Sequence, residues 1–395
     1  MLSLARGGKK AETMEHRISV RARCFPTMAL LGLFMLSLAL PLAAQGPEFQ
    51  FNGIRFNNAI LGFMPVPVGV DLELHVPLNS DGLFFSLRLA GGYEDRLILR
   101  NDADGSPLAK PVSFDAGQWF YWPNAEADTG LLYRPDLEGR WPGVEIFALA
   151  RGRYEENSPG LGTAVFPDAS GLLALSCLAG LEVSTVEKSP RRQLKGYSGE
   201  ISAEWAPQAL GLQGGCDFFR VSANLEGYLP LFSVGEDDRK AISAYAGAYA
   251  TADLAWGDHI PLYVLTSFGG RYLRNGLGSS VRGFQPWGYE AATKAATSLE
   301  LRLVGPGLFG MANLRPMTYL FVDAGYFARL YASPGADKKG LLASAGGAVA
   351  FNILDFAYLG LRAGIKYPDA DPLHDAVYFT DKERFFWNVT FLLHF

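Results

Sequence analysis

The last residues of the chain alternate between apolar and more polar positions. From residue 385 to 395 the apolar set is Phe385, Trp387, Val389, Phe391, Leu393 and Phe395, and Phe386, Asn388, Thr390, Leu392 and His394 lie between them. A period of two places these sets on opposite faces of a β-strand. A chain end with so long an aromatic outer face is typical of a strand that meets lipid on one side and water on the other. The pattern predicts a transmembrane antiparallel β-barrel of the outer-membrane type.

Strand-like segments recur through the rest of the chain, and we predict sixteen strands in all. They cover residues 49–61, 68–76, 83–92, 119–122, 131–133, 144–154, 171–183, 197–205, 217–228, 241–256, 262–269, 296–303, 317–328, 341–352, 357–366 and 385–395. The region 96–142 is the least regular, with many prolines and tryptophans. An even number of strands is the rule for bacterial single-chain barrels.

The connections and the charges agree with a barrel. The longer connections 229–240, 270–295, 331–340 and 367–384 are expected on the outside, and the tight turns 257–260 and 354–356 on the periplasmic side. Because a charge facing lipid is costly, we expect the charged residues of alternating strands to point into the lumen. These are Asp71, Glu73, Arg220 and Glu226.

The N-terminus has the pattern of a secretory signal. Arg17, Arg21 and Arg23 precede an apolar run over residues 28–42, and the small residues Ala43 and Ala44 follow it. We therefore expect a cleaved signal peptide over 1–44 and an outer-membrane barrel over 45–395. Strand-like sequence begins so soon after residue 44 that no periplasmic domain of useful size is expected between them.

Composition excludes several classes of function. Removing residues 1–44 takes away six of the 35 basic and two of the 40 acidic residues, which leaves a net charge of −9 and argues against nucleic acid as a partner. The apolar runs 172–183 and 341–354 are shorter than the roughly 20 residues that a membrane helix needs. Cys177 and Cys216 could pair, but we interpret them as small hydrophobic strand residues.

Three segments near the C-terminus carry more specific information. They are Phe268-Gly269-Gly270 with Ser280-Val281-Arg282-Gly283-Phe284, then Ser298-Leu299-Glu300-Leu301-Arg302, and last Phe321-Val322-Asp323-Ala324-Gly325. Alternation places Glu300 on the lumenal face, opposite its two leucine neighbours, and places Asp323 on one face with Phe321 and Gly325. An arginine inside a barrel needs acceptors, and two inward carboxylates can supply charge-assisted hydrogen bonds.

At these residues the chain resembles the BamA/TamA and two-partner-secretion translocator superfamily, also called the bacterial surface antigen family. The family carries a V-R-G-F/Y motif in a long outer loop that folds into the barrel, followed by a strand with an inward Glu and a strand with F/W-x-D-x-G. The resemblance covers residues 260–395 and implies five strands after the loop. It implies that Arg282 lies at the loop tip, with Glu300 and Asp323 as its partners.

The resulting candidate site joins the loop tip to two strands. Its members are Val281, Arg282, Gly283, Phe284, Glu300, Phe321, Asp323 and Gly325. We expect Gly283 to permit a tight turn and Gly325 to leave room for the loop. We also expect the C-terminal strand to be the signal for the barrel assembly machinery, through Trp387, Val389, Phe391, Leu393 and Phe395.

The resemblance implies assembly or translocation of protein, or of lipid, at the outer membrane. Expected partners are outer-membrane lipid, a client protein and a separate receptor subunit that replaces the missing periplasmic domains. A passive porin and a structural or surface interaction protein are the alternatives. We find no motif of a hydrolase, a phosphate-binding loop or a metal site, so no enzymatic activity, metal or cofactor is expected.

Overall fold

The computed structural model describes residues 48–61, 64–79, 82–95, 98–100, 107–112, 121–135, 143–155, 172–189, 193–210, 216–235, 237, 240–284, 289–311, 314–330, 339–353, 357–367 and 384–393. Fourteen antiparallel strands follow one another in a single hydrogen-bonded path through this part of the chain. They are β1 (Glu48–Leu61), β2 (Met64–Pro77), β3 (Leu83–Asp95), β6 (Tyr121–Tyr133), β7 (Val144–Glu155), β8 (Leu172–Ser184), β10 (Leu194–Ala206), β11 (Asp217–Val234), β12 (Ile242–His259), β13 (Ala291–Val304), β14 (Leu314–Leu330), β15 (Gly340–Ile353), β16 (Ala357–Lys366) and β17 (Phe385–Leu393).

Short elements accompany this path. Strand β9 (Glu187–Lys188) pairs with β10, and β4 (Ile98–Arg100) pairs with β5 (Pro107–Val112) in a separate sheet. The helical turns are η3 (Gln208–Leu210), α2 (Leu262–Thr266), α3 (Leu277–Ser280) and η4 (Leu308–Gly310). Among the described residues, no helix is long and apolar enough to cross a membrane.

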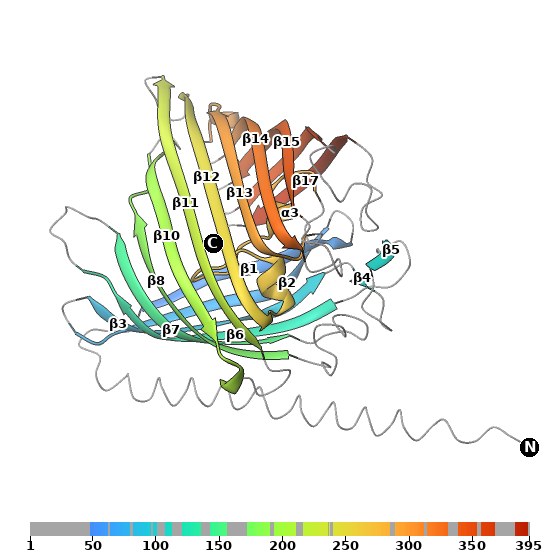
Figure 1. Cartoon of the computed structure of the whole chain (residues 1–395). Helices are drawn as coiled ribbons and strands as arrows, with labels where there is room; N and C mark the ends of the chain where they lie inside the picture. Colours follow the sequence, from blue (N-terminus) through green and yellow to red (C-terminus); the bar gives the residue numbers. More distant parts are fainter. Residues whose placement is uncertain are drawn as a thin grey trace, which may run out of the picture.

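The sheet is strongly curved. In Figure 1 the early strands β1, β2, β6 and β7 run at a steep angle to β10–β14, so that the two groups enclose an interior between them. The all-β fold and the antiparallel barrel architecture predicted from alternation are therefore confirmed. Glu73 and Arg220, which were predicted to face the lumen, are buried, while apolar side chains such as Leu299 cover the outer face.

The two ends of the path define what we call the seam. Strands β1 and β17 contact one another. Over the described residues, however, no hydrogen-bonded register joins them, whereas every other neighbouring pair in the path has one. Within the part of the chain that the structure describes, the join between the first and last strands is thus unpaired.

Over the described residues the path holds fourteen strands where sixteen were predicted, and two of the predictions account for the difference. The predicted strands 119–122 and 131–133 overlap a single strand, β6, and residues 119–120 lie outside the described residues. Pro123 and the alternation of small with acidic residues in this strand hid its regularity. The predicted strand 262–269 is wrong, because Pro261 leads into the helical turn α2. A short apolar run cannot by periodicity alone be told from a buried helical turn.

The wrong prediction of a strand over 262–269 also placed one connection at the wrong end of the sheet. Because β12 runs to His259 and leads straight into the loop, residues 257–260 are not a turn between strands. The β11–β12 connection therefore lies at the end of the sheet opposite the β12–β13 loop, and the prediction that 229–240 shares the side of that loop is wrong. Five strands follow the loop, as expected. Cys177 and Cys216 do not pair, and both are free.

Candidate functional site

The connection between β12 and β13 folds into the interior of the sheet. We call its described part, residues 260–284 and 289–290, the inner loop. Apolar side chains of the loop form a buried cluster with the inward faces of the following strands. The cluster consists of Phe268, Leu277, Val281, Phe284, Tyr289, Ala291, Ala296, Phe327 and Leu342. Burial of these side chains fixes the loop against β13–β15 and places Arg282 beside the carboxylates of β13 and β14.

Arg282 is held by two strands at once. Its Nε donates to Asp323 Oδ2 at 2.7 Å and its Nη2 to Asp323 Oδ1 at 2.6 Å, which makes a bidentate pair. Its Nη1 donates to Glu300 Oε1 at 2.6 Å and its Nη2 to Ser298 Oγ at 2.5 Å. The backbone N–H of Arg282 also donates to Asp323, at 3.0 Å. We call Arg282, Ser298, Glu300 and Asp323 the tip latch.

The tip latch is shielded from solvent. Arg282 is 8% exposed and Asp323 is 0% exposed. The Arg282 guanidinium also lies 3.9 Å from the centre of the Phe321 ring, within the range of a cation–π interaction. Burial alone would lower the pKa of Arg282, but the hydrogen bonds and charge of Asp323, with Glu300, raise it above its usual value. The arginine is thus a permanent cation held by the carboxyl groups of two strands.

Two glycines make this close packing possible. Gly283 has a φ of 93°, and a Cβ there would lie 2.4 Å from Phe386 Cδ1. Gly325 lies under the loop, where a Cβ would lie 2.6 Å from Val281 Cγ2. Both positions therefore exclude a side chain, one by conformation and contact and the other by contact alone.

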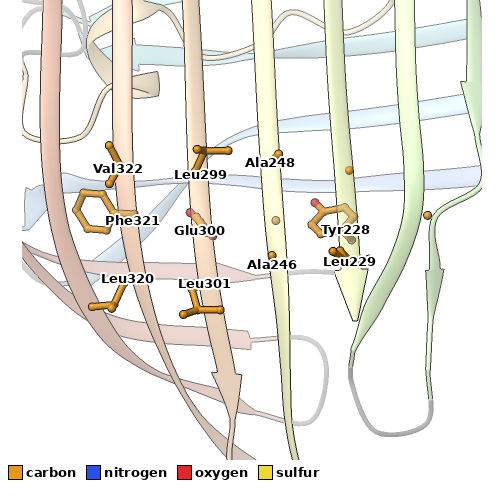
Figure 2. A pocket seen from close by; sticks show the side chains of 13 residues that line it. Tyr228, Leu229, Ala246, Ala248, Leu299, Glu300, Leu301, Leu320, Phe321 and Val322 are labelled. Atoms are coloured by element: carbon orange, nitrogen blue, oxygen red, sulfur yellow. The ribbon is translucent and has the colours of Figure 1, made fainter. Parts of the chain in front are cut away.

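The strands present alternate faces to the loop and to the outside. Figure 2 shows Glu300 between Leu299 and Leu301 on β13, and Phe321 on neighbouring β14. The two leucines lie on the outer face, where Leu299 is 59% exposed, and Phe321 is buried. A hollow of about 710 Å³ along β10–β14 is lined largely by apolar side chains of these strands.

The structure brings all eight predicted loop and strand residues together. Val281 and Phe284 pack in the loop cluster, and Phe321 and Gly325 share the inner face of β14 with Asp323. Sequence reasoning missed Ser298, which shares the inner face of β13 with Glu300, and Arg302, whose Nε donates to Glu300 Oε2 at 2.5 Å. Their alternation with Leu299 and Leu301 was a usable signal.

The double glycine marks the entry of the loop. The backbone N–H of Gly269 donates to both oxygens of Asp253 on β12, each at 3.1 Å. Asp253 also pairs with Arg220 of β11 and with Lys294 of β13, the latter at 3.3 Å. A Cβ on Gly269 would lie 2.2 Å from Ser222 Oγ, so the backbone reaches the wall because no side chain intervenes.

The wall opposite the tip latch is packed with ion pairs. Arg88 of β3 pairs with Asp71, Glu126 and Asp128 on its two neighbouring strands. Arg151 of β7 pairs with Asp128 at 3.0 Å. These side chains are largely buried and occupy the interior beside the loop. Among the described residues, no group of three or more His, Cys, Asp or Glu side chains is placed to hold a metal.

The C-terminal strand has the predicted orientation in its described part. Trp387 and Val389 lie on the outer face of β17, and Trp387 is 66% exposed. Phe391 and Leu393 belong to β17 and pair with Leu359 and Ala357 of β16. Phe395 lies outside the described residues.

Neither a family model nor a curated protein matches the chain. Solved structures do resemble it. BamA from Haemophilus ducreyi lacking POTRA domains 1–3 is 16% identical, with a TM-score of 0.49 over 82% of this chain and 62% of that one. CdiB from Acinetobacter baumannii is 14% identical, with a TM-score of 0.45 over 82% of this chain and 50% of that one.

The chain spans 62% and 50% of the lengths of these two chains.

Proposed function

We propose that this chain is an outer-membrane barrel that inserts or translocates protein, or lipid, and that the inner loop closes its lumen in the resting state. The observation that carries this proposal is the tip latch. A loop cation engages Asp323 and Glu300 from two different strands, with three side-chain contacts of 2.6–2.7 Å, and so holds the loop inside.

The interior supports a closed resting state over an open porin. Loop residues Tyr263, Val264, Leu265 and Phe268 are each 1% exposed or less, and the opposite wall is filled by the ion pairs of Arg88 and Arg151. An open pore would leave such charges hydrated, whereas these are paired and largely buried. A loop that can leave the interior gives the barrel two states, closed and open.

The proposal extends to location, partners and chemistry. We infer export by a signal peptide over residues 1–44 and assembly into the outer membrane through the C-terminal strand. The client is protein or lipid, and a separate periplasmic subunit would deliver it. The proposed role needs no catalytic group, because moving a chain across a membrane breaks no covalent bond.

Single-channel conductance of the refolded protein in planar bilayers tests the closed lumen. We expect the wild type to be nearly silent and Arg282→Ala to conduct, because the loop tip loses both carboxylate partners. Lys195→Ala is the matched control, since it removes an exposed cation whose partner is Glu187 at the surface. A large steady pore in the wild type, unchanged in Arg282→Ala, would identify a porin instead.

Depletion in the host tests the transport role. We expect the abundance of other outer-membrane components to fall when the chain is depleted, and wild type but not Arg282→Ala to restore it. Unchanged outer-membrane composition, together with capture of a partner by the surface loops, would overturn the proposal in favour of an interaction protein.

A further inference from the structure

The inner loop touches a second wall of the interior, far from the tip latch. Arg271 donates through Nη2 to Glu73 Oε1 of β2 at 2.6 Å, and through Nη1 to Glu145 Oε1 of β7. Its backbone N–H donates to Glu200 Oε1 of β10 at 2.7 Å. One loop residue thus contacts carboxylates from three strands of the N-terminal half of the path.

Neighbouring loop atoms strengthen the same attachment. The Tyr272 hydroxyl donates to Glu73 Oε2 at 2.7 Å. From the wall, Arg151 donates to the backbone carbonyls of Gly270 at 3.2 Å and Arg271 at 2.5 Å. The side chain thus binds anions of the wall while the loop backbone accepts from a cation of the wall. We call Arg271, Glu73 and Glu145 the second anchor.

The carboxylates on β7, β8 and β10 repel one another, and a nearby cation reduces this repulsion. Glu145, Glu182 and Glu200 stand directly opposite one another across β7, β8 and β10. Like charges in directly opposed positions of a sheet destabilise it. Arg271 is 5% exposed, and its guanidinium supplies positive charge at Glu145, one end of this row, while its backbone N–H donates to Glu200 at the other end. The acidic row is therefore matched to the loop.

The two attachments lie on opposite sides of the seam. The tip latch holds β13 and β14, and the second anchor holds β2 and β7. Going from β14 to β2 along the sheet means passing β15, β16 and β17, then the unpaired join to β1. The inner loop makes the same connection through the interior, with a charge-assisted hydrogen bond at each end.

We propose that Arg271 is a second positioning residue, which makes the inner loop a brace between the two sides of the seam. With both ends attached, the brace restrains movement of β1–β3 away from β13–β17. Releasing the second anchor frees the seam although the tip latch stays closed. This property belongs to the barrel itself and does not depend on which molecule the barrel transports.

Distances between spin labels on the two sides test the brace. Labels are placed on single cysteines at Val70 of β2 and Leu320 of β14, both on the outer face and 42% and 64% exposed. The background carries Cys177→Ala and Cys216→Ala. Double electron–electron resonance in lipid nanodiscs then reports the distance distribution, and heat-modifiable migration on gels verifies that each variant is folded.

We expect Arg271→Gln to broaden the Val70–Leu320 distribution and shift it to longer distances. Arg274→Gln is the control from the same loop, because Arg274 pairs with Glu200 of β10, in the middle of the path. We expect this control to match the wild type. A distribution for Arg271→Gln that equals the wild type would show that Arg271 only balances charge on its own wall.

A second label pair separates the two ends of the brace. Between Ser280 of the loop and Leu320, we expect Arg282→Gln to broaden the distribution and Arg271→Gln to leave it unchanged. Broadening of this pair by Arg271→Gln would mean that the whole loop leaves at once, and would overturn two independent attachments.

Arg271→Lys keeps the test decisive if the glutamine variant does not fold. Lysine retains the charge but lacks the fork that reaches two carboxylates together, so partial broadening of the Val70–Leu320 distribution is expected. A wild-type width would again overturn the proposal. These distances are independent of conductance and of depletion, so the brace can fail while the transport role stands, and the reverse.

Discussion

Replacing Asp323 with Asn probes the tip latch most directly. Asp323 is fully buried and accepts three hydrogen bonds from Arg282, two from the guanidinium and one from the backbone, at 2.6–3.0 Å. Asparagine keeps the size of the side chain but removes the charge. Its amide also turns one acceptor into a donor that faces the N–H groups of Arg282.

The expected loss in free energy of unfolding depends on the charge of Arg282, which remains buried after the substitution. Removing one partner of a buried ion pair costs about 3–5 kcal/mol, because the other charge remains buried. Arg282 keeps Glu300 at 2.6 Å, so we expect the lower end, about 3 kcal/mol. The Glu300→Gln variant loses the charge that Arg282 and Arg302 share, but glutamine keeps a carbonyl acceptor and the site is 14% exposed, so about 1.5 kcal/mol is expected.

Urea unfolding in lipid vesicles, followed by heat-modifiable migration, measures both variants. The free energy of unfolding should fall by roughly twice as much for Asp323→Asn as for Glu300→Gln. Equal losses, or a loss below about 1 kcal/mol for Asp323→Asn, would refute the view that buried charge pairing holds the loop.

Three further predictions concern packing, the membrane face and thiol chemistry. Gly325→Val should cost about 1–3 kcal/mol and release the loop, because a Cβ there meets Val281 at 2.6 Å, whereas Gly227→Ala, with nothing within 4 Å, should leave unfolding in urea unchanged. Leu299→Arg, on the outer face, should cost about 2–4 kcal/mol in vesicles if the residue lies near the bilayer midplane, and a neutral result would place this face in water. Burial raises the pKa of the Cys216 thiol to about 12, so at pH 8 a maleimide should modify it only after unfolding, and fast labelling of the folded protein would contradict its burial.

Three of the four members of the tip latch were predicted, and its two carboxylates follow a local rule. Glu300 alternates with two leucines, Asp323 alternates with Val322 and Ala324, and the strand period of two sends both carboxylates inward. Arg282 lies only 18 positions before Glu300. The motif resemblance then supplied the pairing, which the contacts of Arg282 show.

The helical turn α2 and the strand β6 could not be predicted from local periodicity. Residues 262–269 are apolar enough for a strand, but they form a helical turn and the entry of the inner loop, buried against the inward faces of β11–β13. In the middle of β6, Glu126 and Asp128 alternate with alanine, so this part of the strand lacks the branched and aromatic residues that are typical of strands.

The amino-acid sequence by itself determined most of the strands, their inner and outer faces and the inward direction of Glu300 and Asp323, because a two-residue period is a local property of the chain. Only the tertiary structure decided the second anchor. Arg271 and Glu73 are 198 positions apart, and no periodicity relates them. They meet because the sheet curves until β2 faces the loop that leaves β12, and that curvature is a property of the whole set of strands.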